Sequence, residues 1–225
     1  MTGMSAGKGN APSGGQTNIY EAADKAIQSI NRYSIKQFDR LRLMKADDIH
    51  LIRAVSEVYD KVAGYARTRY YETAVEAYII GAIQARMTNA DATERVDKVI
   101  TYDWIDEMLE EVDFVTLYRF NTEVERKKQR LTEALAATEN RNDEIDKALR
   151  AWALQTGQYA INVTDMARME AFMDAGVEQV MWNTEKDERV CDKCGPLDGK
   201  VFDIEDAPRK IHWRCRCWYS PVFNK

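Results

Sequence analysis

The sequence predicts an α+β protein with a long, mainly α-helical N-terminal body and a small β-containing C-terminal domain. Three observations predict this fold. No proline occurs between Ser13 and Gly195, and proline is excluded from helix interiors because it lacks the backbone N–H and clashes with the preceding turn. Apolar residues repeat at helical spacing along that stretch. All four cysteines, in contrast, fall within the last 35 residues.

The first segment predicts no folded element. Its Gly, Ser and Pro content indicates a disordered arm over residues 1–17. The letters G-M-S-A-G-K within it suggest a phosphate-binding loop, but such a loop has four residues between its glycines and Ser or Thr after the Lys. The segment also lacks the layout of a signal peptide, so we expect synthesis in the cytoplasm.

Three helical blocks follow in the expected body, residues 18–163. The first runs from Asp47 or Asp48, as its cap, to about Arg86, with one apolar face: Leu51, Val55, Val58, Val62 and Tyr65. The second begins after Thr101 and continues through the charged stretch 123–130 to Leu135, and that charged stretch is expected to be a solvated helix face. The third covers about 143–155. The longest apolar run, 77–83, is too short for a membrane span, which needs about 20 residues.

A change in the sequence pattern, from helix-like to strand-like, marks the expected C-terminal domain, residues 164–225. Thr164 is expected to cap a short helix over 165–175, and Gly176 to end it in the left-handed conformation. β-Branched and aromatic residues then predict short strands at 177–184, 200–204 and 217–223.

The cysteines form two close groups that suggest a metal site. They read Cys191-x2-Cys194, then His212-x2-Cys215-x-Cys217 after a gap of 17 residues. Paired ligands at this separation are typical of a zinc knuckle, and a domain this small has too little core to fold unaided. The sequence therefore predicts a structural zinc ion, which makes this part a zinc-knuckle domain.

Five candidate ligands compete for four positions. The repeated x2 spacing favours Cys191, Cys194, His212 and Cys215. The alternative uses Cys215 and Cys217 together, with His212 outside the ligand set. Four nearby cations are expected to offset the thiolate charge: Arg189, Lys193, Arg214 and Arg216.

Other uses of these residues are weaker alternatives. Disulfides are possible in a protein that leaves the reducing cytoplasm, and free thiols are the remaining option. A catalytic metal would need an open position and a general base, and no such base accompanies the cluster, so we expect no enzyme activity. His50, the other histidine, has no ligand partner near it in sequence and is expected to be structural or solvated.

Residues 164–222 resemble the phage Mu F-like minor head, or head morphogenesis, proteins. The resemblance is carried by W-x-T, D-x-R-V-C-x-x-C, L-D-G-x-V-F and H-x-x-C-R-C in this order. One departure is Trp213, where the family usually has proline after the histidine. The resemblance implies a minor capsid protein of a tailed bacteriophage, in the virion head, with the portal protein or the major capsid protein as partner.

Charge separates this expectation from a nucleic-acid-binding alternative. From Trp182 onward the chain has nine Lys and Arg against eight Asp and Glu, so the segment before it, with 23 against 29, has a net charge of −6 out of the total of −5. An acidic body repels phosphate. The alternative is a zinc-knuckle binder of packaged or ejected DNA, which would use Trp213, Arg214, Arg216, Trp218 and Tyr219. For the head protein we expect only weak contact with packaged DNA.

Overall fold

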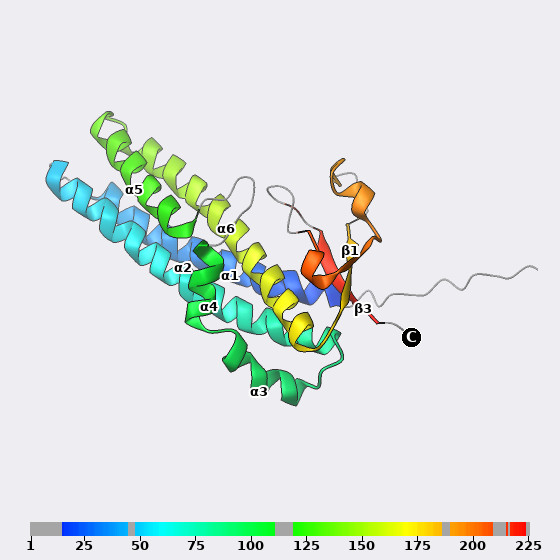
Figure 1. Cartoon of the computed structure of the whole chain (residues 1–225). Helices are drawn as coiled ribbons and strands as arrows, with labels where there is room; N and C mark the ends of the chain where they lie inside the picture. Colours follow the sequence, from blue (N-terminus) through cyan, green and yellow to red (C-terminus); the bar gives the residue numbers. More distant parts are fainter. Residues whose placement is uncertain are drawn as a thin grey trace, which may run out of the picture.

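A computed structural model describes residues 15–44, 48–110, 119–185, 190–208, 215 and 217–223. Four long helices lie side by side along one axis (Figure 1): α1 (Gly15–Arg42), α2 (Asp48–Gln84), α5 (Phe120–Ala136) and α6 (Arg141–Asp174). Two shorter helices, α3 (Asn89–Val99) and α4 (Tyr102–Glu110), pack on the side of this bundle. The strands gather at one end of the bundle (Figure 1). The predicted α+β class, with a helical body and a small C-terminal sheet, is confirmed.

Large aromatic side chains form the centre of the bundle. Trp152 of α6 is 1% exposed and makes an edge-to-face contact with Tyr59 of α2. Its indole N–H donates to the Ser34 hydroxyl of α1 over 3.0 Å, so its one polar atom is satisfied inside the core. Phe120 and Tyr159 extend this cluster, also in edge-to-face contact. The helices α1, α2 and α6 thereby meet at the Trp152 side chain.

The first helical block is confirmed, and α2 buries the predicted face. Leu51, Val55, Val58 and Val62 are each 5% exposed or less, and Tyr65 packs against the same core. The predicted cap at Asp47 or Asp48 lies outside the side chains that the structure describes. Residues 1–14 of the predicted arm lie outside the described residues. Residues 15–17, also assigned to the arm, are helical, because α1 begins at Gly15.

The sequence reading missed α3, although a signal for it exists. Thr88 is the N-cap of α3, and its hydroxyl oxygen accepts the Asp91 backbone N–H over 3.1 Å. A Thr followed three residues later by an acidic residue is a common start of a helix. The second expected block is also divided, because Arg119 has non-helical backbone angles and separates α5 from the part of the chain that holds α4.

Two predictions within α5 and α6 are wrong. In the charged stretch 123–130, Glu125 and Arg130 are exposed as predicted, but Glu123 is 2% exposed. It forms an ion pair with Arg126 over 2.6 Å, and α5 turns this position into the bundle. Thr164 does not cap a new helix, since α6 runs through it without interruption. Its hydroxyl instead donates to the Ala160 carbonyl, one turn earlier, over 2.8 Å. The domain boundary at residue 164 stays a prediction.

The three predicted strands are confirmed as a small antiparallel sheet. The order is β2 (Val201–Asp203), β1 (Gln179–Asn183), β3 (Trp218–Val222), with β1 in the centre. Val180 of β1 pairs with Phe202 of β2 and with Pro221 of β3. Among the helices that the structure describes, none has an apolar stretch long enough to cross a bilayer.

Candidate metal centre

The C-terminal unit, residues 177–223, is joined to α6 by the reversal that the sequence predicted at Gly176. Gly176 has φ = 73°, a value that glycine adopts without strain. Its N–H donates to the Met173 carbonyl, and the Val177 N–H donates to that of Phe172. Phe172 and Val177 also pack together in one apolar cluster. These bonds and this contact form a Schellman motif, which ends the helix and directs the chain into β1.

Strand β1 has an alternating burial pattern, and its two buried residues belong to two different apolar clusters. Val180 is fully buried against Phe172 at the end of α6, whereas Trp182, two residues later, packs among the cysteines. Residues two apart on a strand lie on the same face of a sheet. The same face of β1 therefore contacts the helical body and the cysteine cluster.

The first cysteine pair lies in a tight turn after β1. The Cys194 N–H donates to the Cys191 carbonyl over 3.0 Å, and the Gly195 N–H donates to the same oxygen over 2.9 Å. A short 3-10 helix, η1 (Gly195–Leu197), follows. Such a turn aims two side chains separated by two residues toward one point, which is the geometry that the C-x2-C spacing predicted.

Asp198 connects this turn back to the end of β1. One of its carboxylate oxygens accepts both the backbone N–H of Thr184, over 2.9 Å, and the Thr184 hydroxyl, over 3.1 Å. The Gly199 N–H donates to the Trp182 carbonyl over 2.8 Å. Two of the sequence patterns that carried the resemblance, W-N-T and L-D-G, are thus in direct contact. No role was predicted for Thr184 or Asp198 from the sequence, and only the fixed order of these patterns pointed to them.

Three of the five predicted ligands come together. The sulfur atoms of Cys194, Cys215 and Cys217 all lie within 4.8 Å of one another, and the three side chains are buried. The Cys194 and Cys215 sulfurs are 3.7 Å apart. Tetrahedral zinc with Zn–S bonds of about 2.3 Å separates its sulfurs by about 3.8 Å, whereas a disulfide needs about 2.05 Å. No disulfide joins any two of the four cysteines. The cluster fits a thiolate-bound metal in donor type and in this spacing.

Cys191 adjoins this group, and His212 lies outside the described residues. Cys191 is half-buried and packs against the cluster formed by Trp182 and the other three cysteines. The choice between His212 and Cys217 therefore stays a prediction, although the structure brings Cys217 close to Cys194 and Cys215. Arg189, Arg214 and Arg216 also lie outside the described residues, as does Trp213, and Lys193 is exposed.

Electrostatics in the cluster oppose free thiolates. Burial, together with the neighbouring Cys215 and Cys191 thiols, raises the pKa of Cys194 to about 12. The pKa of Cys217 is raised further, first by its hydrogen bond with Cys215 and then by burial. A bound cation reverses this balance, since it stabilises thiolates directly.

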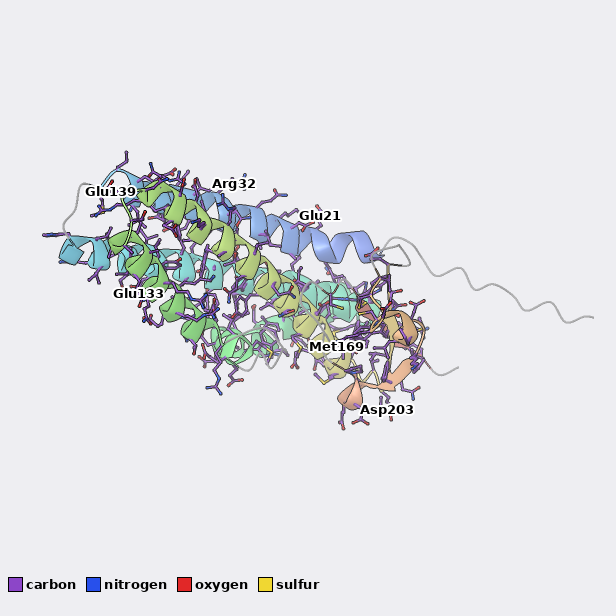
Figure 2. All side chains as sticks on the ribbon, turned by 90° about the horizontal axis from the view of Figure 1, so that it is seen from above. Glu21, Arg32, Glu133, Glu139, Met169 and Asp203 are labelled. Carbon is purple, nitrogen blue, oxygen red and sulfur yellow. The ribbon has the colours of Figure 1, made fainter. Side chains whose placement is uncertain are left out.

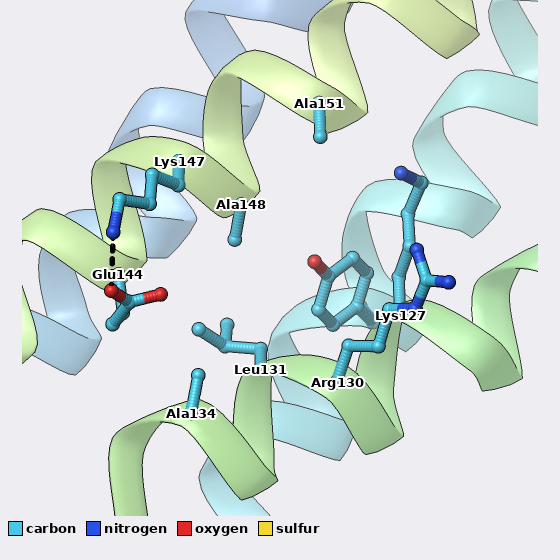
Figure 3. A pocket seen from close by; sticks show the side chains of 9 residues that line it. Lys127, Arg130, Leu131, Ala134, Glu144, Lys147, Ala148 and Ala151 are labelled. Atoms are coloured by element: carbon cyan, nitrogen blue, oxygen red, sulfur yellow. Dashed lines mark hydrogen bonds and ion pairs between the residues drawn. The ribbon is translucent and has the colours of Figure 1, made fainter. Parts of the chain in front are cut away.

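Two other regions, around His50 and in a cavity of the helical body, are weaker candidates for a functional site. His50 is exposed on α2, away from the cysteines, as expected for a solvated residue. A cavity of about 190 Å³ lies between α5 and α6 (Figure 3), lined partly by basic side chains. Lys147 is paired there with Glu144 over 2.6 Å, and Lys127 with Glu123 over 3.4 Å. These lysines are already neutralised within the body.

Comparison with known proteins identifies the C-terminal part of the chain. Residues 121–220 match the family described as phage Mu protein F like protein. No curated protein and no solved structure matches the chain. The matched range covers α5 from its second residue, all of α6, β1 and β2, the first three residues of β3, and the four cysteines. The resemblance predicted from the sequence patterns is confirmed, because residues 121–220 are similar to this family.

Proposed function

We propose that this protein is a structural head morphogenesis protein of a tailed bacteriophage, without enzymatic activity. It acts as a minor capsid protein at or near the portal vertex, or inside the head of the virion. The single observation that carries the proposal is the match of residues 121–220 to the phage Mu F-like family. Its partners are the portal protein, the major capsid protein, or both.

The architecture supports a role in packing against partners. The bundle is held by buried aromatic contacts, while its surface carries many charges. In the body cavity, Lys127 and Lys147 are paired with carboxylates. An assembly protein needs a stable scaffold and an extended surface, and this body supplies both.

The cysteine cluster gives the C-terminal unit a structural zinc ion in this proposal. Zinc binds thiolates in closed four-coordinate sites and supplies folding free energy to units with little core. Cys194, Cys215 and Cys217 would provide three ligands, because their sulfurs lie together. Cys191 would provide the fourth, because it begins the turn that leads to Cys194 and packs on the cluster. This is the all-cysteine alternative of the two ligand sets.

Substitution of single ligands tests this choice. Cys191→Ser, Cys194→Ser and Cys217→Ser should each reduce the zinc content of the purified chain, measured by elemental analysis, while His212→Ala should retain about one zinc per chain. Loss of zinc with His212→Ala but not with Cys217→Ser would support the set that contains His212. A wild-type chain without zinc would remove the metal from the proposal.

Binding to head components tests the function. The full-length chain should co-purify with the portal protein or with immature heads of its own phage, and virions lacking it should show defective head assembly or infectivity. DNA binding should be weak and should disappear as salt is raised, because the chain is acidic overall. Normal heads without the protein, together with tight DNA binding at high salt, would replace this proposal with the DNA-binding alternative.

A further inference from the structure

A second cavity lies between α6 and the C-terminal unit, away from the cysteine sulfurs. Its volume is about 190 Å³, and three methionines of α6 line one wall: Met166, Met169 and Met173. They are three and four residues apart, so they lie on one face of the helix. Ile204, Pro208 and Tyr219 form the opposite wall. Figure 2 places Met169 at the end of the bundle that carries the C-terminal unit.

The walls can adapt to an apolar occupant. Methionine is unbranched and polarisable, and methionine-rich surfaces accept apolar side chains of different shapes. Met173 is 42% exposed, which is high for a large apolar residue, so part of this surface is open to solvent. Tyr219 is fixed in its wall, because its hydroxyl donates to the Pro208 carbonyl and its ring makes an edge-to-face contact with Trp182.

A buried amide at the cavity points to a ligand with a hydrogen-bond acceptor. Asn162 lines the cavity and is 3% exposed. Its side-chain oxygen accepts from Gln158 over 3.1 Å, but its Nδ2 has no hydrogen-bond partner among the described residues. A buried N–H without an acceptor is unfavourable, because it has lost its hydrogen bonds to water and gained none in exchange. An occupant with a carbonyl oxygen would remove that cost.

The charge of the cavity rim and the volume of the cavity favour a peptide segment as the occupant. Glu205 is exposed at the cavity, and Asp165 also lines it, so the described rim is acidic and disfavours the phosphates of DNA. A cavity of this volume is smaller than the roughly 300 Å³ at which small-molecule sites begin. It is suited to one apolar side chain.

We propose that this cavity binds one apolar side chain of a protein partner, flanked in the partner by Lys or Arg. The side chain packs on Met166, Met169 and Met173. A backbone carbonyl beside it accepts from Asn162, and the flanking cation lies near Glu205. The identity of the partner as a head protein rests on the proposed function, whereas the chemistry of the site does not.

Short peptides test the chemistry without a head protein. The full chain, labelled with ¹³C at its methionine methyl groups, is titrated with acetyl-Lys-Leu-Lys-amide and followed by NMR. The signals of Met166, Met169 and Met173 should shift and saturate. Acetyl-Lys-Gly-Lys-amide, which lacks the apolar side chain, and acetyl-Glu-Leu-Glu-amide, which has the wrong charge, should produce much smaller shifts. Equal responses to all three peptides, or none at all, would overturn the proposal.

Matched variants extend the test to the natural partner. Met173→Lys places a cation in the cavity, and the last turn of a helix tolerates a cation well, so folding should be unaffected. It should weaken binding of the portal or capsid protein by about tenfold or more. Leu154→Lys is the control, because Leu154 is on the same helix, is 52% exposed and does not line the cavity. Glu205→Lys, which changes the charge at the cavity, and its control Glu133→Lys, which lies outside the cavity, form a second pair of variants.

The outcomes separate the two proposals. If head proteins bind and Met173→Lys weakens that binding while Leu154→Lys does not, both are supported. If head proteins bind all variants equally, the cavity is not the docking site and the proposed function stands. If no head protein binds but the leucine peptide shifts the three methionines, the cavity proposal stands and the proposed function fails.

Discussion

The helical body and the C-terminal unit of this chain are stabilised by different means. The body has a continuous core in which Trp152, Phe120 and Tyr159 are each about 1% exposed. The C-terminal unit has a short sheet with one central strand and two small apolar clusters, one of which consists largely of cysteines. A bundle of long helices buries enough apolar surface to fold by itself, whereas a unit of this size needs a further crosslink.

The contrast implies that the two regions should respond to different perturbations. Removal of metal should affect the C-terminal unit and leave the helices intact, while a cavity in the aromatic core should affect the helices and leave the cysteines in place. Where the regions meet, at Arg168, a single change should affect both. Four predictions test this division, in order of decreasing effect.

The largest effect is expected from loss of the metal site. Cys194→Ser, or a strong chelator on the native chain, should release the proposed zinc ion and unfold the C-terminal unit, because apparent binding free energies of structural zinc are about 10–16 kcal/mol. Limited proteolysis should then cut after residue 176. The helical signal in circular dichroism should change little, because α1 to α6 lie before that residue. Loss of most helicity on chelation would show that the two regions do not fold separately.

A large effect confined to the body is expected from Trp152→Ala. This change removes a fully buried ring and its hydrogen bond to Ser34, at a cost of about 3–5 kcal/mol. The cost is measured by chemical denaturation followed at a helical wavelength. Leu154→Ala, at an exposed position on the same helix, should change stability by no more than about 0.5 kcal/mol. Zinc content should stay unchanged in both variants.

Sequence patterns predicted those features that depend on residues close together in the chain. Apolar spacing located α2 and its buried face, alternation and turn residues located the three strands, and cysteine spacing located the candidate metal site. Gly176 was identified correctly because few other residues adopt its backbone conformation.

The failures concern positions whose environment is set by distant segments. Thr164 has the residue type of a helix cap, but α6 continues through it. Thr164 is buried in the packed molecule, and its hydroxyl donates to the Ala160 carbonyl of the same helix instead of capping a new one. Glu123 belongs to a charged run, yet the packing of α5 on the bundle buries it, and its ion pairs with Arg126 and Lys127 offset the cost of that burial. Neither residue's own type, nor that of its neighbours, distinguishes these outcomes.

An intermediate effect is expected where the two regions meet. Arg168 of α6 is 2% exposed and donates to the Gln84 side chain of α2, over 2.8 Å, and to the Tyr219 carbonyl of β3, over 2.9 Å. Hydrogen bonds from a charged donor contribute about 1.5–3 kcal/mol. Arg168→Met keeps much of the apolar stem and removes these bonds, so it should destabilise the chain by about that amount.

The readout for Arg168→Met must report on both regions. Proteolysis after residue 176 should become faster even with metal bound, and the helical transition should move to lower denaturant concentration. Arg95→Gln is the control, because the pair of Arg95 with Asp174 is substantially exposed and should contribute about 1 kcal/mol or less. If Arg168→Met behaved like Arg95→Gln, the contact between the regions would be held by apolar packing rather than by this side chain.

The smallest effects are expected from two glycines that occupy opposite kinds of backbone. Gly64 lies inside α2, has helical backbone and open space where a Cβ would be, so Gly64→Ala should stabilise the body by about 0.5–1 kcal/mol. Gly176 also has open space, but its φ of 73° is unfavourable for alanine, so Gly176→Ala should destabilise by about 1–2 kcal/mol. Since neither side chain makes a contact, the opposite signs isolate backbone conformation as the cause. The Gly176 change should also loosen the C-terminal unit relative to α6, detected as faster proteolysis, whereas the Gly64 change should not. Two shifts of the same sign in denaturation would contradict the Schellman reversal as the element that joins the two regions.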